Sequence, residues 1–186
     1  MNDAPQVGDP APDAELIEAP EGRAVLSSAW SAGTAVIVFL RYFGCPFCQM
    51  QVASLRDDRE RFETADAEVV LVGQGSTEEA ERFVQGRRLP FRCLVDPDRS
   101  AYRAYGLGRG TPAQVYGPRV FVPFVKANLT GHPQLGLRGG SFHQMPGSFV
   151  VDRTGTLRFV HRNRTVADTP PNQALLDAVA EIAGRV

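Results

Sequence analysis

The sequence has little of what marks membrane, nucleic-acid-binding or fibrous proteins. No stretch approaches the roughly 18 apolar residues of a membrane-spanning helix. The basic residues are almost all arginines, and their longest run is Arg87–Arg88. The formal net charge is -1. We therefore expect no contact with nucleic acid or a membrane surface. Hydrophobic residues make up 43% and charged residues 22%, an ordinary globular composition, and 186 residues predict a single domain over 1–186.

The sequence is also poor in cysteine and histidine, with three of each. A structural zinc site usually takes four such ligands, often as two spaced pairs, and Cys93 with three scattered histidines makes a poor complement to Cys45 and Cys48. We therefore expect no metal and no cofactor. Residues 1–12 lack the basic and apolar regions of a secretory signal, which predicts a cytoplasmic protein with reduced thiols. A secreted chain whose signal had already been removed would look the same.

A CxxC motif lies between an apolar run and an amphipathic segment. Residues 35–40 (AVIVFL) are continuously apolar and rich in β-branched side chains, which is typical of a central strand buried on both faces. After the motif begins, apolar side chains recur at helical spacing: Cys48, Val52, Leu55 and Phe62. The sequence therefore predicts that Cys45 and Cys48 lie where a buried strand turns into a helix.

This position predicts different roles for the two thiols. A helix N-terminus presents unpaired N–H groups and a partial positive charge, and both stabilise a thiolate. Pro46 suits the first helical position, which places Cys45 at the N-cap, where it can face solvent as the attacking thiol. Cys48 shares a helical face with Val52 and Leu55, so we expect it to be shielded and to act as the resolving thiol.

The surrounding sequence predicts alternating strands and helices. Strands are expected at residues 68–73 and 91–95, with a helix between them that begins at a capping box of Ser76 and Glu79. A hairpin is expected over 16–26, a short helix over 100–105, and after Pro146 a hairpin over 148–161. A last amphipathic helix, with Pro170 in its first turn, reaches residue 183. The order strand, helix, strand implies a right-handed parallel crossover.

Residues 107–144 form the least regular part of the sequence, with seven glycines and four prolines. We expect an irregular insertion with one short helix over residues 120–125, in which Pro123 is tolerated only near the start. Long loops in a compact domain are usually functional covers or mobile segments. Phe121 and Phe124 are expected in the core or in the contact of a homodimer rather than in a substrate pocket.

Four motifs together resemble a known family. They are Val7–Pro12 (VGDPAP), Phe39–Cys48 (FLRYFGCPFC), Gln144–Gly147 (QMPG) and His161–Arg164 (HRNR). Over nearly the whole chain, the sequence resembles the peroxiredoxin-like branch of the alkyl hydroperoxide reductase and thiol-specific antioxidant (AhpC/TSA) superfamily. The resemblance implies an α/β thioredoxin-like fold, with a central mixed sheet flanked by helices, an N-terminal hairpin extension and an insertion before a cis-proline.

The resemblance also implies a site and an activity. Cys45 and Cys48 take the positions of a redox-active dithiol, and Pro146 that of the cis-proline, which would let the backbone of Met145 meet an extended substrate or a mixed-disulfide partner. The implied protein is a thiol-disulfide oxidoreductase or peroxiredoxin-like antioxidant that reduces disulfides or hydroperoxides. An external thiol donor, such as a thioredoxin system, would reset it.

One motif of true peroxiredoxins is missing. These proteins place Pro and Thr or Ser before the peroxidatic cysteine as PxxxTxxC; here the corresponding residues are Val38 and Tyr42 before Cys45, or Arg41 and Cys45 before Cys48. The sequence also resembles, more distantly, thioredoxin-like prostaglandin F synthases with such a CxxC. A reductase of a peroxidic small molecule and a redox-responsive binding protein with little turnover are therefore kept as alternatives.

Arg41 and Cys93 each have two interpretations. Arg41, four residues before Cys45, is expected either to lower the pKa of that thiol and hold a peroxide or carboxylate, or to form a surface salt bridge. Cys93 shares a strand face with Phe91 and Val95, which favours a buried core thiol over a sensor or second resolving thiol.

Two histidines are weaker candidates. His143 is close enough to Pro146 in the sequence to approach the dithiol as a general base, although a helix end that stabilises a thiolate needs none. His161, together with Arg162 and Arg164, is expected at a polar surface or in contact with an anion.

Overall fold

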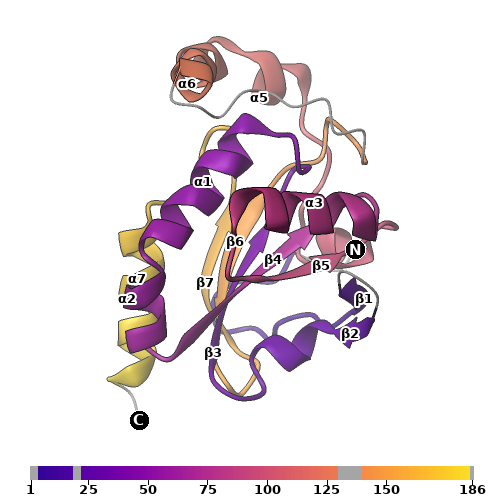
Figure 1. Cartoon of the computed structure of the whole chain (residues 1–186). Helices are drawn as coiled ribbons and strands as arrows, with labels where there is room; N and C mark the ends of the chain where they lie inside the picture. Colours follow the sequence, from indigo (N-terminus) through magenta and orange to yellow (C-terminus); the bar gives the residue numbers. More distant parts are fainter. Residues whose placement is uncertain (1–3, 19–21, 130–139, 185–186) are drawn as a thin grey trace.

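The strands form one mixed sheet in the computed structural model, which describes residues 4–18, 22–129 and 140–184, with only the backbone of Lys126 (Figure 1). In the described residues the sheet has seven strands in the order β2-β1-β5-β4-β3-β6-β7. The strands are β1 (Glu15–Glu18), β2 (Arg23–Val25), β3 (Thr34–Phe39), β4 (Ala67–Gly73), β5 (Arg92–Val95), β6 (Gly147–Val151) and β7 (Leu157–Arg162). Strands β3, β4 and β5 are parallel, and the other pairs are antiparallel.

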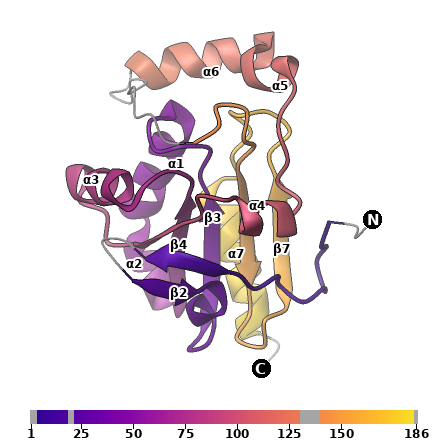
Figure 2. The same cartoon turned by 90° about the vertical axis from the view of Figure 1, so that its right-hand side faces the viewer.

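Helices cover both faces of this sheet (Figures 1 and 2). They are η1 (Leu26–Ala29), α1 (Pro46–Asp57), α2 (Arg59–Thr64), α3 (Thr77–Arg87), α4 (Ser100–Ala104), α5 (Pro112–Tyr116), α6 (Pro118–Leu129) and α7 (Asn172–Ala183). Because strand side chains alternate between faces, Val36 and Val38 pack with α1, α2, α3 and α7, whereas Ile37 and Phe39 pack with η1 and α4. The expected α/β thioredoxin-like architecture is confirmed.

Both predicted hairpins are present. In the N-terminal hairpin Leu16 pairs with Ala24, and β1 extends the sheet beside β5. The β6–β7 turn is held by Asp152, whose Oδ1 accepts hydrogen bonds from the backbone N–H groups of Thr154 at 2.9 Å and Thr156 at 3.0 Å. The last helix begins later than expected, since Pro171, not Pro170, directly precedes its first residue as the N-cap.

The helix after the dithiol is interrupted, whereas the sequence predicted a continuous helix to Phe62. Helix α1 ends at Asp57, and α2 begins at Arg59 after the non-helical backbone of Asp58. The carboxylate of Asp58 accepts a hydrogen bond of 2.8 Å from the side chain of Asn172, at the start of α7. This tertiary contact stabilises the break, while Phe62 is still buried as its spacing predicted.

The insertion contains two helices in its described part, not one. Helix α5 begins at a capping box in which Thr111 and Gln114 bond each other's backbone N–H groups, with Pro112 in the first turn. Helix α6 begins at Pro118, and Pro123 lies inside it rather than near its start. Such a proline removes one backbone hydrogen bond. Residues 130–139 of the predicted insertion lie outside the described residues.

Candidate active site

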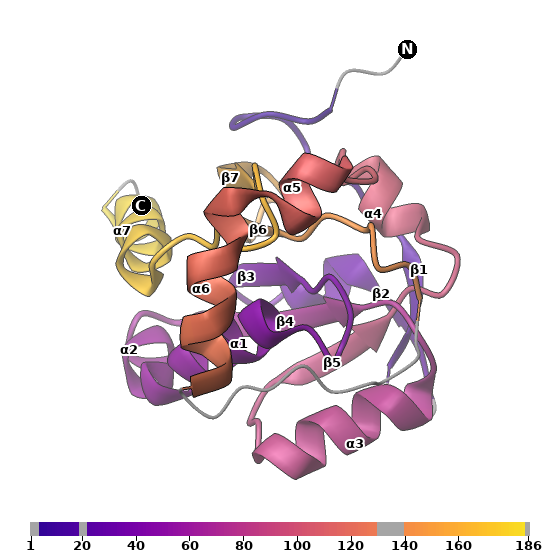
Figure 3. The same ribbon diagram turned by 90° about the horizontal axis from the view of Figure 1, so that it is seen from above.

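The dithiol lies at the edge of the sheet where the parallel strands β3, β4 and β5 end. Helix α1 begins there, and α6 crosses over its first turns (Figure 3). Gly147, the first residue of β6, pairs with Phe39, the last residue of β3, so Pro146 lies beside the loop that leads to Cys45. The carboxyl edge of a parallel sheet is a common place for ligand sites.

Cys45 and Cys48 occupy the predicted positions along the helix. Cys45 is the N-cap of α1, Pro46 follows in its first turn, and Cys48 lies one turn inside. The backbone N–H of Arg41 donates a hydrogen bond of 3.2 Å to Sγ of Cys48. All three cysteines of the chain are free thiols.

Cys45 does not face solvent, which corrects the sequence prediction. Its exposed fraction is 0%, and that of Cys48 is 1%. Val115 of α5 and Val120 of α6 belong to the same apolar cluster as Cys45, so the insertion covers the N-terminus of α1. The predicted position on the helix was right, but the cover depends on a segment about 70 residues further along the chain.

The pKa values of the two thiols are shifted in opposite directions. Burial opposes ionisation of Cys45, but hydrogen bonds from the thiol and backbone N–H of Cys48, with help from the charge of Arg41, outweigh it and lower the pKa of Cys45 to about 7. Burial and the neighbouring Cys45 raise the pKa of Cys48 well above its usual value. Cys45 is therefore the thiol that ionises near neutral pH, and Cys48 stays protonated.

Arg41 points into the site rather than to the protein surface. Its side chain is buried, and Nε donates a hydrogen bond of 2.7 Å to the carbonyl oxygen of Phe142. The guanidinium also lies 5.0 Å from the centre of the Tyr42 ring. In the part of the chain that the structure describes, it forms no ion pair with a carboxylate, so the alternative of a surface salt bridge is wrong.

Met145 and Pro146 lie beside the dithiol, but the backbone of Met145 is already bonded. Its N–H donates to the carbonyl oxygen of Gly108 at 3.0 Å, and its carbonyl accepts from the side chain of Gln144 at 3.2 Å. An extended substrate that paired with Met145, as the sequence suggested, would have to replace these bonds.

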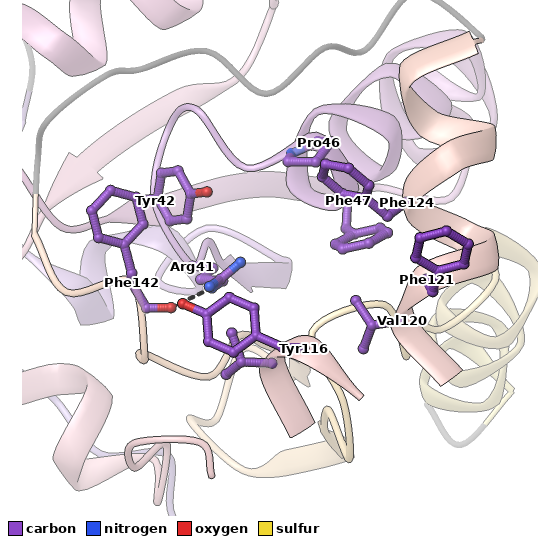
Figure 4. Close-up of a pocket in the computed structure, with 10 residues that line it drawn as sticks. Arg41, Tyr42, Pro46, Phe47, Tyr116, Val120, Phe121, Phe124 and Phe142 are labelled. Carbon is purple, nitrogen blue, oxygen red and sulfur yellow. Dashed lines mark hydrogen bonds between the residues drawn. The ribbon is translucent and has the colours of Figure 1, made fainter. Parts of the chain in front are cut away.

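A cavity of about 220 Å³ lies between the dithiol loop and the insertion (Figure 4). Its described lining comes from the loop and first turn of α1 (Arg41, Tyr42, Pro46, Phe47), from α5 and α6 (Val115, Tyr116, Val120, Phe121, Phe124) and from Phe142. Phe121 and Phe124 thus line a cavity. The sequence had favoured a place in the core or in a homodimer contact over a pocket for these two residues. Pro46 and Phe47 connect this cavity directly to the CxxC motif.

The other sequence candidates are not among the described residues that line the cavity. Cys93 is buried in the same cluster as Phe91 and Val95, and burial raises its pKa to about 12, which supports the prediction of a core thiol. The ring of His143 stands 6.1 Å from that of Tyr116 and is not part of the described lining. Nε2 of His161 lies 2.8 Å from the carbonyl oxygen of Asp168.

Two arginines near His161 have separate environments. Arg162 donates a hydrogen bond of 2.7 Å to the carbonyl oxygen of Tyr105, and Arg164 is an exposed residue whose Nε lies 3.8 Å from the carboxylate of Asp168. Neither takes part in the lining of the cavity in the described residues.

Gln74 is a part of the site that the sequence prediction missed. Its Nε2 donates to the carbonyl oxygens of Arg41 and Ser141, and its Oε1 accepts from the N–H of Ser141 at 2.8 Å. Gln74 directly follows β4, and the ends of parallel neighbours meet at one edge of a sheet. A polar residue at that position could therefore have been assigned to the site from the strand order alone.

Two further properties follow from the described residues. Within residues 4–18, 22–129 and 140–184, no group of three or more His, Cys, Asp or Glu side chains could hold a metal ion. None of the described helices has the length and apolar character needed to cross a membrane.

Known proteins resemble this chain in both sequence and fold. A thioredoxin-like protein AAED1 from the chloroplast of Arabidopsis thaliana is 23% identical over 163 residues, which are 82% of this chain and 64% of that protein. Peroxiredoxin-like 2C of Mus musculus is 27% identical over 175 residues, covering 88% of this chain and 76% of the mouse protein. This chain therefore spans somewhat less than two thirds of the plant protein's length.

Among solved structures, the peroxidoxin BcpB of Mycobacterium tuberculosis superposes with a TM-score of 0.72 at 20% sequence identity, covering 95% of this chain and 97% of that one. At this level of identity the likeness shows a shared fold. The model of the AhpC/TSA family matches residues 7–160, which include the dithiol and all of the described residues that line the cavity. The chain therefore belongs to the AhpC/TSA family.

Proposed function

We propose that the protein is a dithiol oxidoreductase that reduces hydroperoxides or disulfides with Cys45 and Cys48. The observation that carries the proposal is the position of two free thiols one helical turn apart at the start of α1, with Cys45 at the N-cap and beside the charge of Arg41. A thiolate is the reactive form of cysteine, and the pKa of Cys45, about 7, provides one at neutral pH. The thiol of Cys48 hydrogen-bonds Cys45, so the two sulfurs are neighbours, as a resolving thiol requires.

With a hydroperoxide ROOH, the Cys45 thiolate attacks the terminal oxygen and the O–O bond breaks. This leaves a sulfenic acid on Cys45 and an alkoxide that takes up a proton to become ROH. The sulfur of Cys48 then attacks the sulfenic sulfur, and the hydroxide that leaves combines with the Cys48 proton as water. In total, ROOH and two thiols give ROH, water and a Cys45–Cys48 disulfide.

With a disulfide substrate, Cys45 forms a mixed disulfide, which Cys48 resolves in the same way. In either case an external dithiol, such as a thioredoxin, returns the Cys45–Cys48 disulfide to two thiols. We propose a cytoplasmic location, because three free thiols suit a reducing compartment. The covered dithiol favours small substrates, because a protein disulfide would require α5 and α6 to move away from the start of α1.

The test is turnover of hydrogen peroxide, an organic hydroperoxide and insulin disulfides, coupled to thioredoxin, its reductase and NADPH. We expect Cys45→Ser to abolish turnover with every substrate. Cys48→Ser should stop after one oxidation, leaving Cys45 as a sulfenic acid or a mixed disulfide that mass spectrometry detects. Cys93→Ser, at a buried cysteine that does not line the cavity, is the matched control and should keep its activity. Unchanged turnover in Cys45→Ser would disprove the assignment.

A redox-responsive binding protein is the second candidate, and the burial of both thiols favours it. If oxidation of Cys45 and Cys48 changed how the insertion packs on α1, a partner could sense the redox state without catalysis. This alternative predicts negligible steady-state turnover with all three substrates, together with partner binding that changes on reduction. The same coupled assay therefore separates the two candidates.

A further inference from the structure

The cavity beside the dithiol combines an apolar wall with a single positive charge. Of the ten described residues that line it, nine are aromatic, aliphatic or proline, and Arg41 alone is charged (Figure 4). The aromatic rings come from both sides, with Phe47 on α1 and Phe121 and Phe124 on α6. Rings of this kind offer face and edge contacts to an apolar ligand.

The charge of Arg41 is nearly enclosed. Its exposed fraction is 6%, and in the described parts of the chain no carboxylate forms an ion pair with it. The carbonyl oxygen of Phe142 accepts a hydrogen bond from Nε of Arg41, and the ring of Tyr42 lies against the guanidinium. A guanidinium has five N–H donors in a planar fork that matches a carboxylate, so this arginine retains donor capacity for an anion. The thiolate of Cys45 is one counter-charge for this buried guanidinium, and an anionic ligand on the unused N–H donors would supply a second.

The loop that carries Phe142 fixes the direction of this arginine. Gln74 bonds both the carbonyl of Arg41 and the backbone of Ser141, next to Phe142. The guanidinium is therefore held at one end of the cavity, opposite the rings of α6 (Figure 4). A ligand that satisfies both ends needs an acid group and an apolar body.

We infer that this cavity binds a small amphipathic carboxylate, with the acid group on Arg41 and the apolar body against Phe121 and Phe124. One part of this inference rests on the proposed function. If Cys45 and Cys48 reduce hydroperoxides, the substrates that fit this cavity are hydroperoxides of small amphipathic carboxylic acids. The volume of about 220 Å³ is below the roughly 300 to 1,000 Å³ of pockets for drug-sized ligands, so the ligand is small or partly exposed. Phe121, which is 67% exposed, forms the outer rim where such a ligand would leave the cavity.

The binding can be tested without any redox chemistry. Calorimetric titration of the reduced full chain with octanoate should show one saturable site, and octan-1-ol and octylammonium should bind at least tenfold more weakly. Phe121→Ala should weaken octanoate binding about threefold to tenfold, because it removes the outer apolar wall. Val122→Ala is the matched control, since Val122 is 71% exposed on the same helix and does not line the cavity, and it should bind like the parent protein.

Arg41→Gln should weaken octanoate binding at least tenfold while leaving octan-1-ol nearly unaffected. Arg103→Gln, at an exposed arginine that bonds the carbonyl of Asp98, is the charge control and should change nothing. Equal affinity for the acid and the alcohol, absence of saturable binding, or equal effects of Phe121→Ala and Val122→Ala would overturn the inference. Cys45→Ser should still bind octanoate. Binding without turnover would therefore contradict the proposed function alone, and turnover without binding would contradict only this inference.

Discussion

The backbone N–H of Arg41 donates a hydrogen bond to Sγ of Cys48 at 3.2 Å, although the side chain of Arg41 turns away to the cavity. One residue thus contacts Cys48 with its backbone and lines the cavity with its side chain. Its charge also favours the thiolate of Cys45. The chemistry of the dithiol and the contents of the cavity are therefore coupled through Arg41.

The acidity of Cys45 should depend on its partner thiol. The pKa of Cys45 is about 7, largely because the thiol and backbone N–H of Cys48 bond its sulfur against the cost of burial. We expect the ultraviolet absorbance of thiolate to rise with a midpoint near pH 7 in the parent protein and at a clearly higher pH in Cys48→Ala. Cys93→Ser should keep the parent midpoint, since burial holds the pKa of Cys93 at about 12. An unchanged midpoint in Cys48→Ala would show that the partner thiol is not the cause.

The same shift predicts how stability changes with pH. The pKa of Cys45 is about 7 when folded and 9.0 in its ordinary state, so between these values the unfolded chain binds more protons. The free energy of unfolding should therefore rise with pH from 7 to 9 relative to Cys45→Ser, by an amount on the order of 2 kcal/mol or less. Urea unfolding of both reduced proteins at several pH values measures the difference. If the free energy of unfolding of the parent protein instead fell relative to that of Cys45→Ser between pH 7 and 9, folding would raise the pKa of Cys45 rather than lower it.

The sequence predicted the sheet and the position of the dithiol because these depend on local patterns. The apolar run at 35–40, the capping box of Ser76 and Glu79, and the proline after Cys45 each specify a strand or a helix start within a few residues. All three are present in the structure. The parallel pairing of β3 with β4 followed from the same order of elements.

The environment of the dithiol could not be predicted in the same way. The burial of Cys45 and the lining of the cavity depend on how α5 and α6 pack on α1, between segments about 70 residues apart. Glycines and prolines in the insertion suggested irregular structure, yet the capping box of Thr111 and Gln114 was a readable signal for α5. The interruption at Asp58 depends on Asn172, more than 100 residues away, and no local pattern marks it.

Gly73 should tolerate no side chain. A Cβ at this position, at the end of β4, would overlap the ring of Phe43, which is buried beside the dithiol loop. We expect Gly73→Ala to destabilise the protein by about 1 to 3 kcal/mol through overpacking. Gly86→Ala is the matched control, because nothing lies within 4 Å of its Cβ inside helix α3, and it should be neutral or stabilising by about 0.5 to 1 kcal/mol. Denaturant unfolding compares the two, and equal effects would contradict the close contact.

Gln74 should stabilise the contact between the dithiol loop and the segment that carries Ser141 and Phe142. Its amide bonds the carbonyl of Arg41 and both backbone groups of Ser141, so Gln74→Leu leaves buried polar groups without partners. We expect a loss of about 1 to 3 kcal/mol in the free energy of unfolding and a weaker affinity for octanoate. Gln85→Leu is the control, because the amide of the exposed Gln85 bonds only the Glu81 carboxylate among the described contacts. A stability loss without any change in octanoate affinity would limit Gln74 to a structural role.

The packing of α6 on α1 should control the reactivity of Cys45. Val120 is buried in the cluster that contains Cys45, so Val120→Ser is expected to weaken this packing by about 1 to 3 kcal/mol and to raise the population of locally open molecules. The rate of Cys45 alkylation at pH 7 should rise at least fivefold, and it should not change in Val122→Ser, whose side chain is exposed. Mass spectrometry assigns the label to each cysteine. Cys93 is buried on β5 and does not line the cavity in the described residues, so equal acceleration at Cys93 and Cys45 would indicate global unfolding and contradict a local cover.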